Sequence, residues 1–486
     1  MIINRSFKEF KFRHRSKKNQ ILYISKNVKN DDDISNLINN FLVEKNSFIF
    51  ESVEKGKIKG RYTIFGRNPD KVWEFNNNNS YLIKNNKKIK LNGKPQQLIE
   101  NIIEGFKFKV PSGLPPISSL ISGYFSYDAI RYVEKIPNSC KDDLKVPDVR
   151  LLRPRTLIIH DNLKKKIFYI INVFNDEKIR DYSKKYFEVK SELSKLLTQS
   201  SKMSLTQSNF KNSNKIYIKS NTSKNNFFKM VKKAKKYIKL GDIFQVVLSQ
   251  RFEAKLTKKP LEIYKKLRVT NPSPFMYFFN FRDFQIIGAS PEILVRLRDN
   301  KVTVRPIAGT RPRGRTDAQD KFYEKDLLKD KKELSEHLML LDLGRNDAGK
   351  VSKVNTVKVT ESFVVERYSH VMHIVSNVIG EYNKKFSKFK SLLAGFPAGT
   401  VSGAPKIRAM EIIDELEKSK RKVYAGGIGY FSANGEFDTC IALRTAVAKN
   451  KKFFVQAGAG IVADSIPKKE YEETINKAKA LINALK

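Results

Sequence analysis

Short apolar runs separated by polar turns dominate the first 175 residues of the chain. Residues 47–50, 62–65 and 155–159, for example, are rich in β-branched and aromatic side chains. Runs of this length between polar residues predict β-strands. The next stretch is rich in Lys, Ser, Asn and Gln, and it predicts a helix followed by a flexible linker.

The pattern changes from about residue 221. Residues 227–240 place apolar side chains at helical spacing, and Gly241 with Asp242 predicts the end of that helix. The apolar run at 243–248 predicts a buried strand, and helix and strand signals alternate from there on. Residues 469–485 predict a last helix with one apolar face.

These patterns divide the chain into an N-terminal strand-rich domain (1–175), a polar linker (176–220) and a C-terminal domain (221–486). With 40% hydrophobic residues, the chain can bury a substantial core. No apolar run approaches the ~18 residues that a membrane helix needs. The basic N-terminus lacks the apolar segment of a secretory signal.

The two cysteines, Cys140 and Cys440, lie far apart in the sequence. They indicate neither a disulfide framework nor a zinc site, and this content is typical of a cytoplasmic protein.

A formal net charge of +44 raises a rival class, a protein that binds nucleic acid or an anionic membrane. The lysines are spread along the whole chain, and no nucleic-acid-binding motif accompanies them. We therefore expect a solvated basic surface, with neither nucleic acid nor membrane as a partner. Such a surface would still attract small anionic substrates.

Two pairs of glutamates lie three residues apart on predicted helices: Glu333 with Glu336, and Glu470 with Glu473. That spacing places each pair on one helix face. Two such pairs can build the oxygen-only site that Mg2+ prefers. Taken alone, each pair is more typical of a solvated helix face, because 30% of the residues are charged.

Glycine-rich segments at 396–406, 425–430 and 457–460 could hold a carboxylate on their backbone N–H groups. None has the spacing of a phosphate-binding loop, and each one alone is typical of a tight turn or of close strand packing. His370 and His373 flank an apolar run. Either could act as a general base, although a histidine in that position is more often structural.

No nucleophilic serine elbow occurs, and neither cysteine lies in a glycine-bounded turn, so the chain offers no glutaminase chemistry of its own.

The sequence resembles the chorismate-utilising enzymes, most closely anthranilate synthase component I. The motifs that carry the resemblance occur in the family's order over about the last 265 residues, with further matches at 50–66 and 113–137. They include GDIFQVVLSQRF (241–252), GASPEILVR (288–296), RPIAGTRPRG (305–314), EHLMLLDLGRND (336–347), YSHVMHIVS (368–376), PAGTVSGAPKIRAMEII (397–413) and QAGAGIVADS (456–465).

The resemblance implies an α+β fold. Two large antiparallel β-sheets face each other with helices packed outside, and the active site lies between them in the C-terminal region, which is then the chorismate-binding catalytic domain. Family members that add water carry Lys at the position of Gln245, and aminodeoxychorismate synthases usually carry Lys at the position of Ala308. Gln245 cannot act as a base and Ala308 cannot attack the ring. The resemblance therefore implies direct attack by ammonia and anthranilate as the product, with aminodeoxychorismate synthase as the alternative.

The resemblance also implies roles for individual residues. Glu292 would be the general acid that protonates the departing hydroxyl, and His373 the base for the later loss of pyruvate. Gln245 completes the predicted catalytic set. Mg2+ would be bound mainly by Glu336 and Glu473, supported by Glu333 and Glu470. The predicted substrate contacts are Thr310, Thr400, Tyr424, Arg444, Gly458, Gly460 and Lys477.

Two further expectations concern regulation and partners. The segment around Glu51 and Ser52 resembles the family's site for feedback inhibition by L-tryptophan, the end product of the pathway that this reaction would commit to. Ammonia would come from glutamine through a separate glutamine amidotransferase subunit, component II. The remaining walls of the inhibitor site would be Pro274, Phe275, Met276 and Tyr430.

Overall fold

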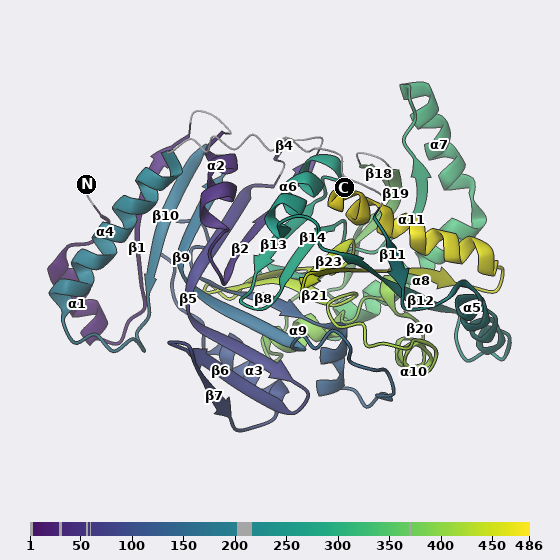
Figure 1. Ribbon diagram of the computed structural model, residues 1–486, viewed down its shortest axis with the longest axis horizontal. Coiled ribbons are helices and arrows are strands. Elements are labelled where there is room, and N and C mark those ends of the chain that lie inside the picture. The colour runs from purple at the N-terminus through teal and green to yellow at the C-terminus, as the bar shows by residue number, and fades with distance from the viewer. Residues whose placement is uncertain (1–2, 29–31, 55–56, 59, 202–215, 369–370) are drawn as a thin grey trace.

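Within the residues that the structure describes, a network of 22 β-strands, paired antiparallel, connects the N-terminal and C-terminal parts of the chain. Two long strands, β5 (Tyr62–Asn76) and β9 (Val149–Asp161), pair along almost their whole length within it (Figure 1). The computed structural model describes residues 3–28, 32–54, 57–58, 60–201, 216–368 and 371–486.

The two long strands are the place where the network divides into two arms. The first half of β5 pairs with β2 (Ser47–Glu51), and its second half pairs with β6 (Asn79–Lys84). Strand β9 divides its partners in the same way. The register of β5 against β9 shifts between Pro69 and Lys71. Because proline has no N–H to donate, the ladder is interrupted there, and a bulge of this kind lets a strand bend from one sheet into another.

Each arm is a broad antiparallel sheet. The first arm runs in the order β1 (Gln20–Asn27), β10 (Lys166–Val173), β9, β5, β2, β13 (Phe275–Asn280), β14 (Gln285–Ser290), β23 (Thr445–Lys449), β24 (Lys452–Ile461), β12 (Gln245–Lys255) and β11 (Ile218–Ser220). The second arm runs β7 (Lys87–Leu91), β6, β5, β9, β8 (Leu120–Phe125), β21 (Gly427–Ser432), β22 (Phe437–Ile441), β15 (Ile293–Arg298), β16 (Lys301–Val304) and β19 (Val371–Glu381), which also pairs with β17 (Ile307–Pro312) and β18 (Lys358–Arg367).

The arms face each other across a shared hydrophobic core. Phe48 and Tyr277 from the first arm lie in one buried cluster with Tyr124 and Ile428 from the second. Since side chains alternate along a strand, the intervening residues of the first arm point to its other face. Helices α2 (Asp32–Phe41), α4 (Tyr182–Ser201), α6 (Pro260–Thr270) and α11 (Pro467–Leu485) pack there. Helices α3 (Pro95–Glu104), α5 (Lys224–Lys239), α9 (Lys388–Ala394) and α10 (Lys406–Leu416) pack in another cluster with β8 and β15.

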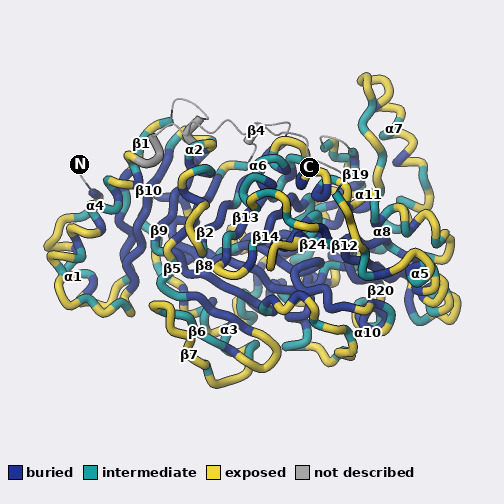
Figure 2. The backbone as a smooth tube through the Cα atoms, viewed as in Figure 1, coloured by how far each residue is buried: buried dark blue, intermediate teal, exposed yellow. Residues whose placement is uncertain are grey.

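Helix α7 (Asp317–Lys329) stands clear of the body and is mostly exposed (Figure 2). The elements not named above are α1 (Phe7–Arg15), α7, α8 (Lys331–Gly349), the 3-10 helices η1 (Tyr127–Tyr132) and η2 (Gly399–Val401), β20 (Gly403–Ala404), and the separate pair β3 (Val53–Glu54) and β4 (Lys57–Ile58).

The predicted fold class is confirmed, with the addition that β5 and β9 join the two sheets into one network. The expected helices are α5 and α11, and the helix expected at the start of the 176–220 stretch is α4. The strand expected at 243–248 begins at Gln245 and continues to Lys255. The predicted flexible end of the linker, residues 202–215, lies outside the described residues.

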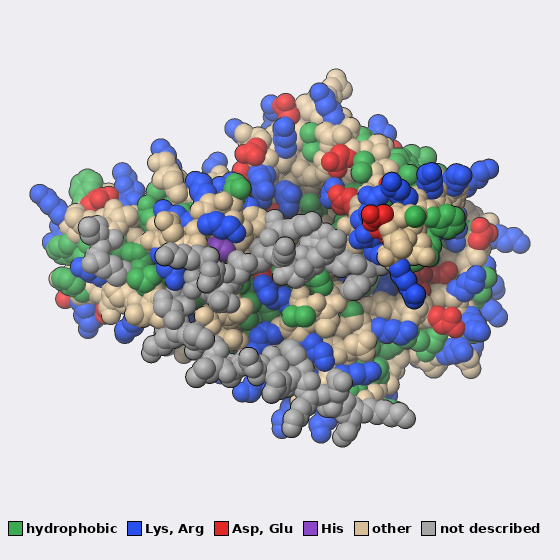
Figure 3. All heavy atoms as spheres, turned by 90° about the horizontal axis from the view of Figure 1, so that it is seen from above, with side chains coloured by type: hydrophobic (Ala, Val, Ile, Leu, Met, Phe, Trp, Pro, Cys, Tyr) green, Lys and Arg blue, Asp and Glu red, His purple; other side chains and the backbone are tan. Residues whose placement is uncertain are grey.

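Basic side chains are distributed over the surface. Figure 3 shows Lys and Arg scattered across the face seen from above, interspersed with acidic side chains. No helix among the described residues has the length and hydrophobicity needed to cross a membrane.

Candidate active site

A cavity of about 800 Å³ lies at the C-terminal part of the network, lined from β12, β24, β17 and β19 and from helices α8 and α11. It brings together residues that are up to 235 positions apart, from Gln245 to Ala480. Every residue predicted for catalysis, substrate binding or metal binding lines it: Gln245, Glu292, Thr310, Glu333, Glu336, His373, Thr400, Tyr424, Arg444, Gly458, Gly460, Glu470, Glu473 and Lys477.

Two helices present the glutamate pairs to this cavity. Helix α8 begins after Asp330, whose carboxylate accepts hydrogen bonds from the N–H groups of the first turn, as an N-cap does. Helix α11 begins at a proline, which suits a first turn because proline's missing N–H would be unpaired there. Glu336 Oε1 accepts from Gln245 Nε2 at 3.0 Å, and Glu473 Oε1 pairs with Lys477 Nζ at 2.7 Å.

The carboxylates repel one another. Burial and the neighbouring Glu336 raise the pKa of Glu333. Burial raises the pKa of Glu470, and Glu473 adds to the effect. Within the described residues no three acidic, His or Cys side chains are arranged to hold a metal ion by themselves. The donor set nevertheless fits Mg2+, which binds through one or two carboxylates with water and substrate oxygens, and a cation would relieve the repulsion.

Glu292 has the properties of a general acid. It lies in the turn between β14 and β15, and its Oε2 accepts a hydrogen bond from Thr400 Oγ1 at 3.0 Å. Burial raises its pKa to about 7, although Thr400, Arg444 and Lys477 act in the opposite direction. Much of this carboxyl group is therefore protonated near neutral pH, as proton donation requires.

His373 has the properties of a base. Its Nδ1 lies 2.7 Å from the carbonyl oxygen of Gly309 and 3.1 Å from Thr310 Oγ1. A proton on Nδ1 that is donated to the carbonyl leaves Nε2 unprotonated and able to accept. Burial, together with the charges of Arg444 and Lys477, lowers the pKa of His373 to about 4, although the hydrogen bond with Gly309 acts in the opposite direction. The imidazole is therefore neutral at physiological pH. His370 lies outside the described residues.

Two cations in the cavity suit an anionic ligand. The half-buried side chain of Arg444 has no hydrogen-bond partner among the described residues, and burial lowers its pKa. Lys477 Nζ donates to the carbonyl oxygen of Gly458 at 3.2 Å besides pairing with Glu473. An unpaired guanidinium in a partly desolvated cavity can bind a carboxylate through two hydrogen bonds.

The two glycines of β24 leave room for polar side chains. A Cβ on Gly458 would lie 2.7 Å from the hydroxyl of Tyr424, and one on Gly460 would lie 2.5 Å from Gln245 Nε2. Both positions pair with β12 in regular register. The glycines therefore let the side chains of Tyr424 and Gln245 approach the strand closely.

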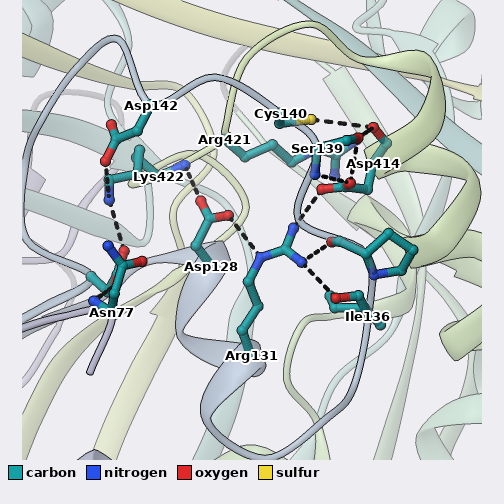
Figure 4. Close-up of polar contacts among 12 residues, drawn as sticks. Asn77, Asp128, Arg131, Ile136, Ser139, Cys140, Asp142, Asp414, Arg421 and Lys422 are labelled. Carbon is teal, nitrogen blue, oxygen red and sulfur yellow. Dashed lines mark hydrogen bonds and ion pairs between the residues drawn. The ribbon is translucent and has the colours of Figure 1, made fainter.

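The fully buried guanidinium of Arg421 binds two segments that line the cavity. Arg421 donates to the carbonyl oxygens of Val401 and Val247, each at 2.6 Å, and pairs with Glu417. Figure 4 shows it beside a polar cluster, including Asp128 and Lys422, that joins η1 and the loop after it to the segment after α10. The segments that Arg421 contacts carry Thr400 and Gln245, and Tyr424 follows it by three residues.

Sequence analysis missed two cations of this cavity, Lys332 and Lys469. Each lies four residues before a predicted metal ligand, Glu336 or Glu473, and so on the same helix face. That spacing was the signal that could have identified them. Lys332 also acts between the helices, because its charge lowers the pKa of Glu470.

A second cavity, of about 750 Å³, contains all the residues predicted for the inhibitor site: Glu51, Ser52, Pro274, Phe275, Met276 and Tyr430. Pairing of β2 with β13 places Glu51 opposite Met276 and so joins two distant motifs. Glu51 Oε1 accepts from Tyr264 at 2.5 Å and from Arg268 at 2.8 Å. Its buried Oε2 has no hydrogen-bond partner among the described residues.

Comparison with known proteins agrees with this geometry. Residues 46–483 match the model of the chorismate binding enzyme family. The chain is 46% identical over 485 residues to "Anthranilate synthase component 1" of Cereibacter sphaeroides, covering 99% of this chain and 97% of that relative. It is also 46% identical over 443 residues to the protein of the same name from Acetivibrio thermocellus, covering 90% of each.

Solved structures give the same result. The crystal structure of anthranilate synthase component I from Streptococcus pneumoniae TIGR4 matches with a TM-score of 0.78 and 40% identity, covering 87% of this chain and 93% of that one. MenF, the menaquinone-specific isochorismate synthase of Escherichia coli, matches with a TM-score of 0.71 at 18% identity over 98% of each chain, which shows the shared fold alone. This chain therefore belongs to the chorismate-binding enzymes, in their anthranilate synthase component 1 family.

Proposed function

We propose that the protein is a lyase that converts chorismate and ammonia to anthranilate and pyruvate. The observation that carries the proposal is the pair Gln245 and Ala308, both of which line the cavity that holds Glu292 and His373. Gln245 donates to Glu336 and is not a base, and Ala308 has no nucleophilic atom. The cavity thus has no base at position 245 to activate water and no nucleophile at position 308 to attack the ring, which favours ammonia as the nucleophile.

The side chains suggest an order of events. Arg444 and Lys477 hold the carboxylates of chorismate, and ammonia attacks C2 of the ring. Glu292 donates its proton to the C4 hydroxyl, which leaves as water. His373 then takes the proton from C2 as the enolpyruvyl group departs with its electron pair and, after gaining a proton, becomes pyruvate. The ring is aromatic after that step, and this drives the elimination.

We further propose that Mg2+ is the cofactor. Glu336 and Glu473 would be its principal ligands, with Glu333 and Glu470 in support. When bound, the ion would neutralise the charge of the ring carboxylate. The raised pKa values of Glu333 and Glu470 support this assignment, because an empty cluster of carboxylates is electrostatically costly.

We propose that ammonia is supplied from glutamine by a glutamine amidotransferase subunit. The relatives are named component 1, which supports a second component. Both cysteines of this chain have raised pKa values caused mainly by burial, so neither is an activated thiolate. Both are also free, as is typical of a cytoplasmic protein, and a cytoplasmic location stays a prediction.

Product identification tests the proposed reaction. Purified chain is incubated with chorismate, Mg2+ and ammonium at alkaline pH, where free NH3 is available, and the products are separated by chromatography. We expect anthranilate and pyruvate in equal amounts, and we expect a chelator of divalent ions to stop their formation. Aminodeoxychorismate as the product would instead favour the folate-branch alternative, and chelator-resistant turnover would contradict the metal assignment.

L-Tryptophan is the proposed inhibitor, bound in the second cavity with its ammonium group on Glu51 Oε2. Glu51→Gln keeps an amide oxygen for Tyr264 and Arg268 but replaces the other oxygen by a donor that repels ammonium. Loss of a charge-assisted hydrogen bond of about 1.5–3 kcal/mol should weaken tryptophan binding by about 10–100-fold. Calorimetric titration measures this, with uninhibited kcat expected to stay unchanged.

Glu44→Gln is the matched control, because Glu44 lies outside this cavity and pairs with Arg67 at 2.6 Å. It should bind tryptophan as the wild type does. Full retention of tryptophan affinity in Glu51→Gln would contradict the assigned contact.

A further inference from the structure

Tyr368 lies between the two cavities. It follows β18 directly, and its backbone N–H donates to the carbonyl oxygen of Val371 at 2.8 Å. The residues that line both cavities are Pro274, Pro291, Ile307 and Tyr368. Tyr368 is the only one of these four with a polar side chain, so it is the shared wall residue that can also form directed contacts.

One of these contacts is with the proposed base. The rings of Tyr368 and His373 meet edge to face, with centroids 5.5 Å apart and planes at 61°. The hydrogen bond from Nδ1 to Gly309 restrains His373 at one nitrogen but leaves the ring free to tilt about that bond. The edge-to-face contact restrains the tilt, and so restrains the direction of Nε2.

Tyr368 is itself held on two sides. Its hydroxyl donates to Glu366 Oε2 at 2.8 Å, and Arg313 donates to its carbonyl oxygen at 2.7 Å. Glu366 is fixed in turn by Arg305, which donates to both carboxylate oxygens at 2.5 Å and 3.1 Å. Such a two-point pair is geometrically specific. Arg305 and Glu366 line the second cavity, the one that contains Glu51.

We propose that Tyr368, clamped by the Arg305–Glu366 pair, is a positioning residue that fixes the imidazole of His373 for proton transfer. This inference rests on the proposed function, because His373 is the base of that reaction. Misplacement of a reacting group by about 1 Å can cost about 100-fold in rate. A residue that sets the direction of Nε2 therefore affects turnover through the imidazole.

Removal of the ring should also change the solvation of His373. The charged and titratable groups that face His373 are Glu366 on β18, Arg444 after β22, Lys477 on α11 and Tyr368 itself. Burial is the largest cause of the lowered pKa of His373. Because the ring of Tyr368 covers one side of the imidazole, its removal should admit water and raise the pKa of His373 toward the ordinary value.

The test compares Tyr368→Ala, Tyr368→Phe and a matched control, Tyr186→Phe. Tyr186 donates its hydroxyl to the carbonyl oxygen of Arg5 at 2.8 Å and lines neither cavity. Histidine side chains are titrated by NMR between about pH 5 and pH 8, with the His373 signal assigned from a His373→Gln variant. Steady-state kcat and KM for chorismate are measured in parallel.

We expect His373 to stay neutral over this range in wild type, Tyr368→Phe and the control. In Tyr368→Ala it should titrate within the range, and kcat should fall about 10–100-fold with little change in KM. Tyr368→Phe keeps the ring and loses only the hydrogen bond to Glu366, so its kcat should lie between those of wild type and Tyr368→Ala. Tyr368→Leu replaces the alanine variant if that one does not fold, since it keeps apolar volume but lacks the ring.

A ring-deleted variant whose His373 titration and kcat both match wild type would overturn the inference. An equal loss of kcat in Tyr368→Phe and in the Tyr186→Phe control would also overturn it. If wild type makes no anthranilate, the proposed function fails. The NMR titration still reports whether Tyr368 controls the environment of His373, so the two failures can be told apart.

Discussion

Replacing Glu292 by Gln is expected to lower kcat by about 10²–10⁴-fold, the usual contribution of a positioned general acid. The amide keeps the size of the side chain and can still accept a hydrogen bond from Thr400. It cannot release a proton to the departing hydroxyl. Chorismate binding should change little, because the cations assigned to its carboxylates, Arg444 and Lys477, remain. Single-turnover kinetics with enzyme in excess over chorismate measures the chemical step directly.

The same assignment fixes the direction of the pH dependence. The pKa of Glu292 is raised to about 7, and the acid form is the active one. The rate per molecule of free NH3 should therefore be highest below that pH and fall as the pH rises through it. Thr400→Val removes the hydrogen bond that stabilises the carboxylate, so it should raise the pKa of Glu292 and move the decline to higher pH. A kcat in Glu292→Gln equal to that of wild type would contradict the role of Glu292 as general acid. So would a decline in rate that moves to lower pH in Thr400→Val.

The elements that the sequence predicted are those with a strong local signal. The helical spacing of residues 227–240 and the apolar face of 469–485 correspond to α5 and α11. Strands β2 and β9 appear where short apolar runs predicted them, but β9 is longer than its run. Local patterns failed where a strand contains residues that disfavour strands. Strand β5 continues beyond the predicted run at 62–65 through Pro69 and Asp70, because β9 pairs along both sides of the bulge.

The continuity of the two sheets is a long-range property. It depends on two strands that each exchange partners halfway along, and no window of sequence contains both partners. The 176–220 stretch shows the opposite limit: the helix expected at its start is present as α4, but its polar composition gave no sign that Leu193 and Leu196 are buried in the core cluster outside the first arm.

For the site, the residues that sequence analysis named are those with distinctive chemistry in motifs of a known family. It did not identify residues that act through contacts. Tyr368 was part of the YSHVMHIVS motif but received no role. Its hydrogen bond to Glu366, and that of Glu366 to Arg305, form only when the β18–β19 hairpin is folded. Arg421 lies among other basic residues at 418–422 and reads as surface charge. It is in fact among the most deeply buried side chains of the described residues.

The burial of Arg421 leads to the largest expected effect on stability. Its side chain and that of Glu417 are 1% and 3% exposed. Glu417 also accepts from the N–H and the hydroxyl of Ser249 on β12, each at 2.8 Å. Arg421→Met would leave the Glu417 carboxylate buried without a counter-charge. Breaking a buried pair in this way costs about 3–5 kcal/mol, which chemical denaturation should report as a lower free energy of unfolding.

Two comparisons separate the lost charge pairing from general damage. Lys353→Met removes one partner of an ion pair in which both side chains are more than half exposed, at 61% and 58%, and it should cost no more than about 1 kcal/mol. Arg421→Met combined with Glu417→Gln removes both charges and keeps an acceptor for Ser249. It should recover much of the stability lost by the single variant, because the penalty comes mainly from the unpaired carboxylate.

The double variant, Arg421→Met with Glu417→Gln, then separates effects on stability from effects on kcat. Arg421 also donates to the carbonyl oxygens of Val401 and Val247, and methionine cannot replace these two bonds. If they set the positions of Thr400 and Gln245, the double variant should fold stably and still show a reduced kcat. A double variant that recovers both stability and kcat would mean that the pair only neutralises buried charge. No recovery of stability would mean that the bonds to Val401 and Val247, rather than the charge on Glu417, hold these segments together.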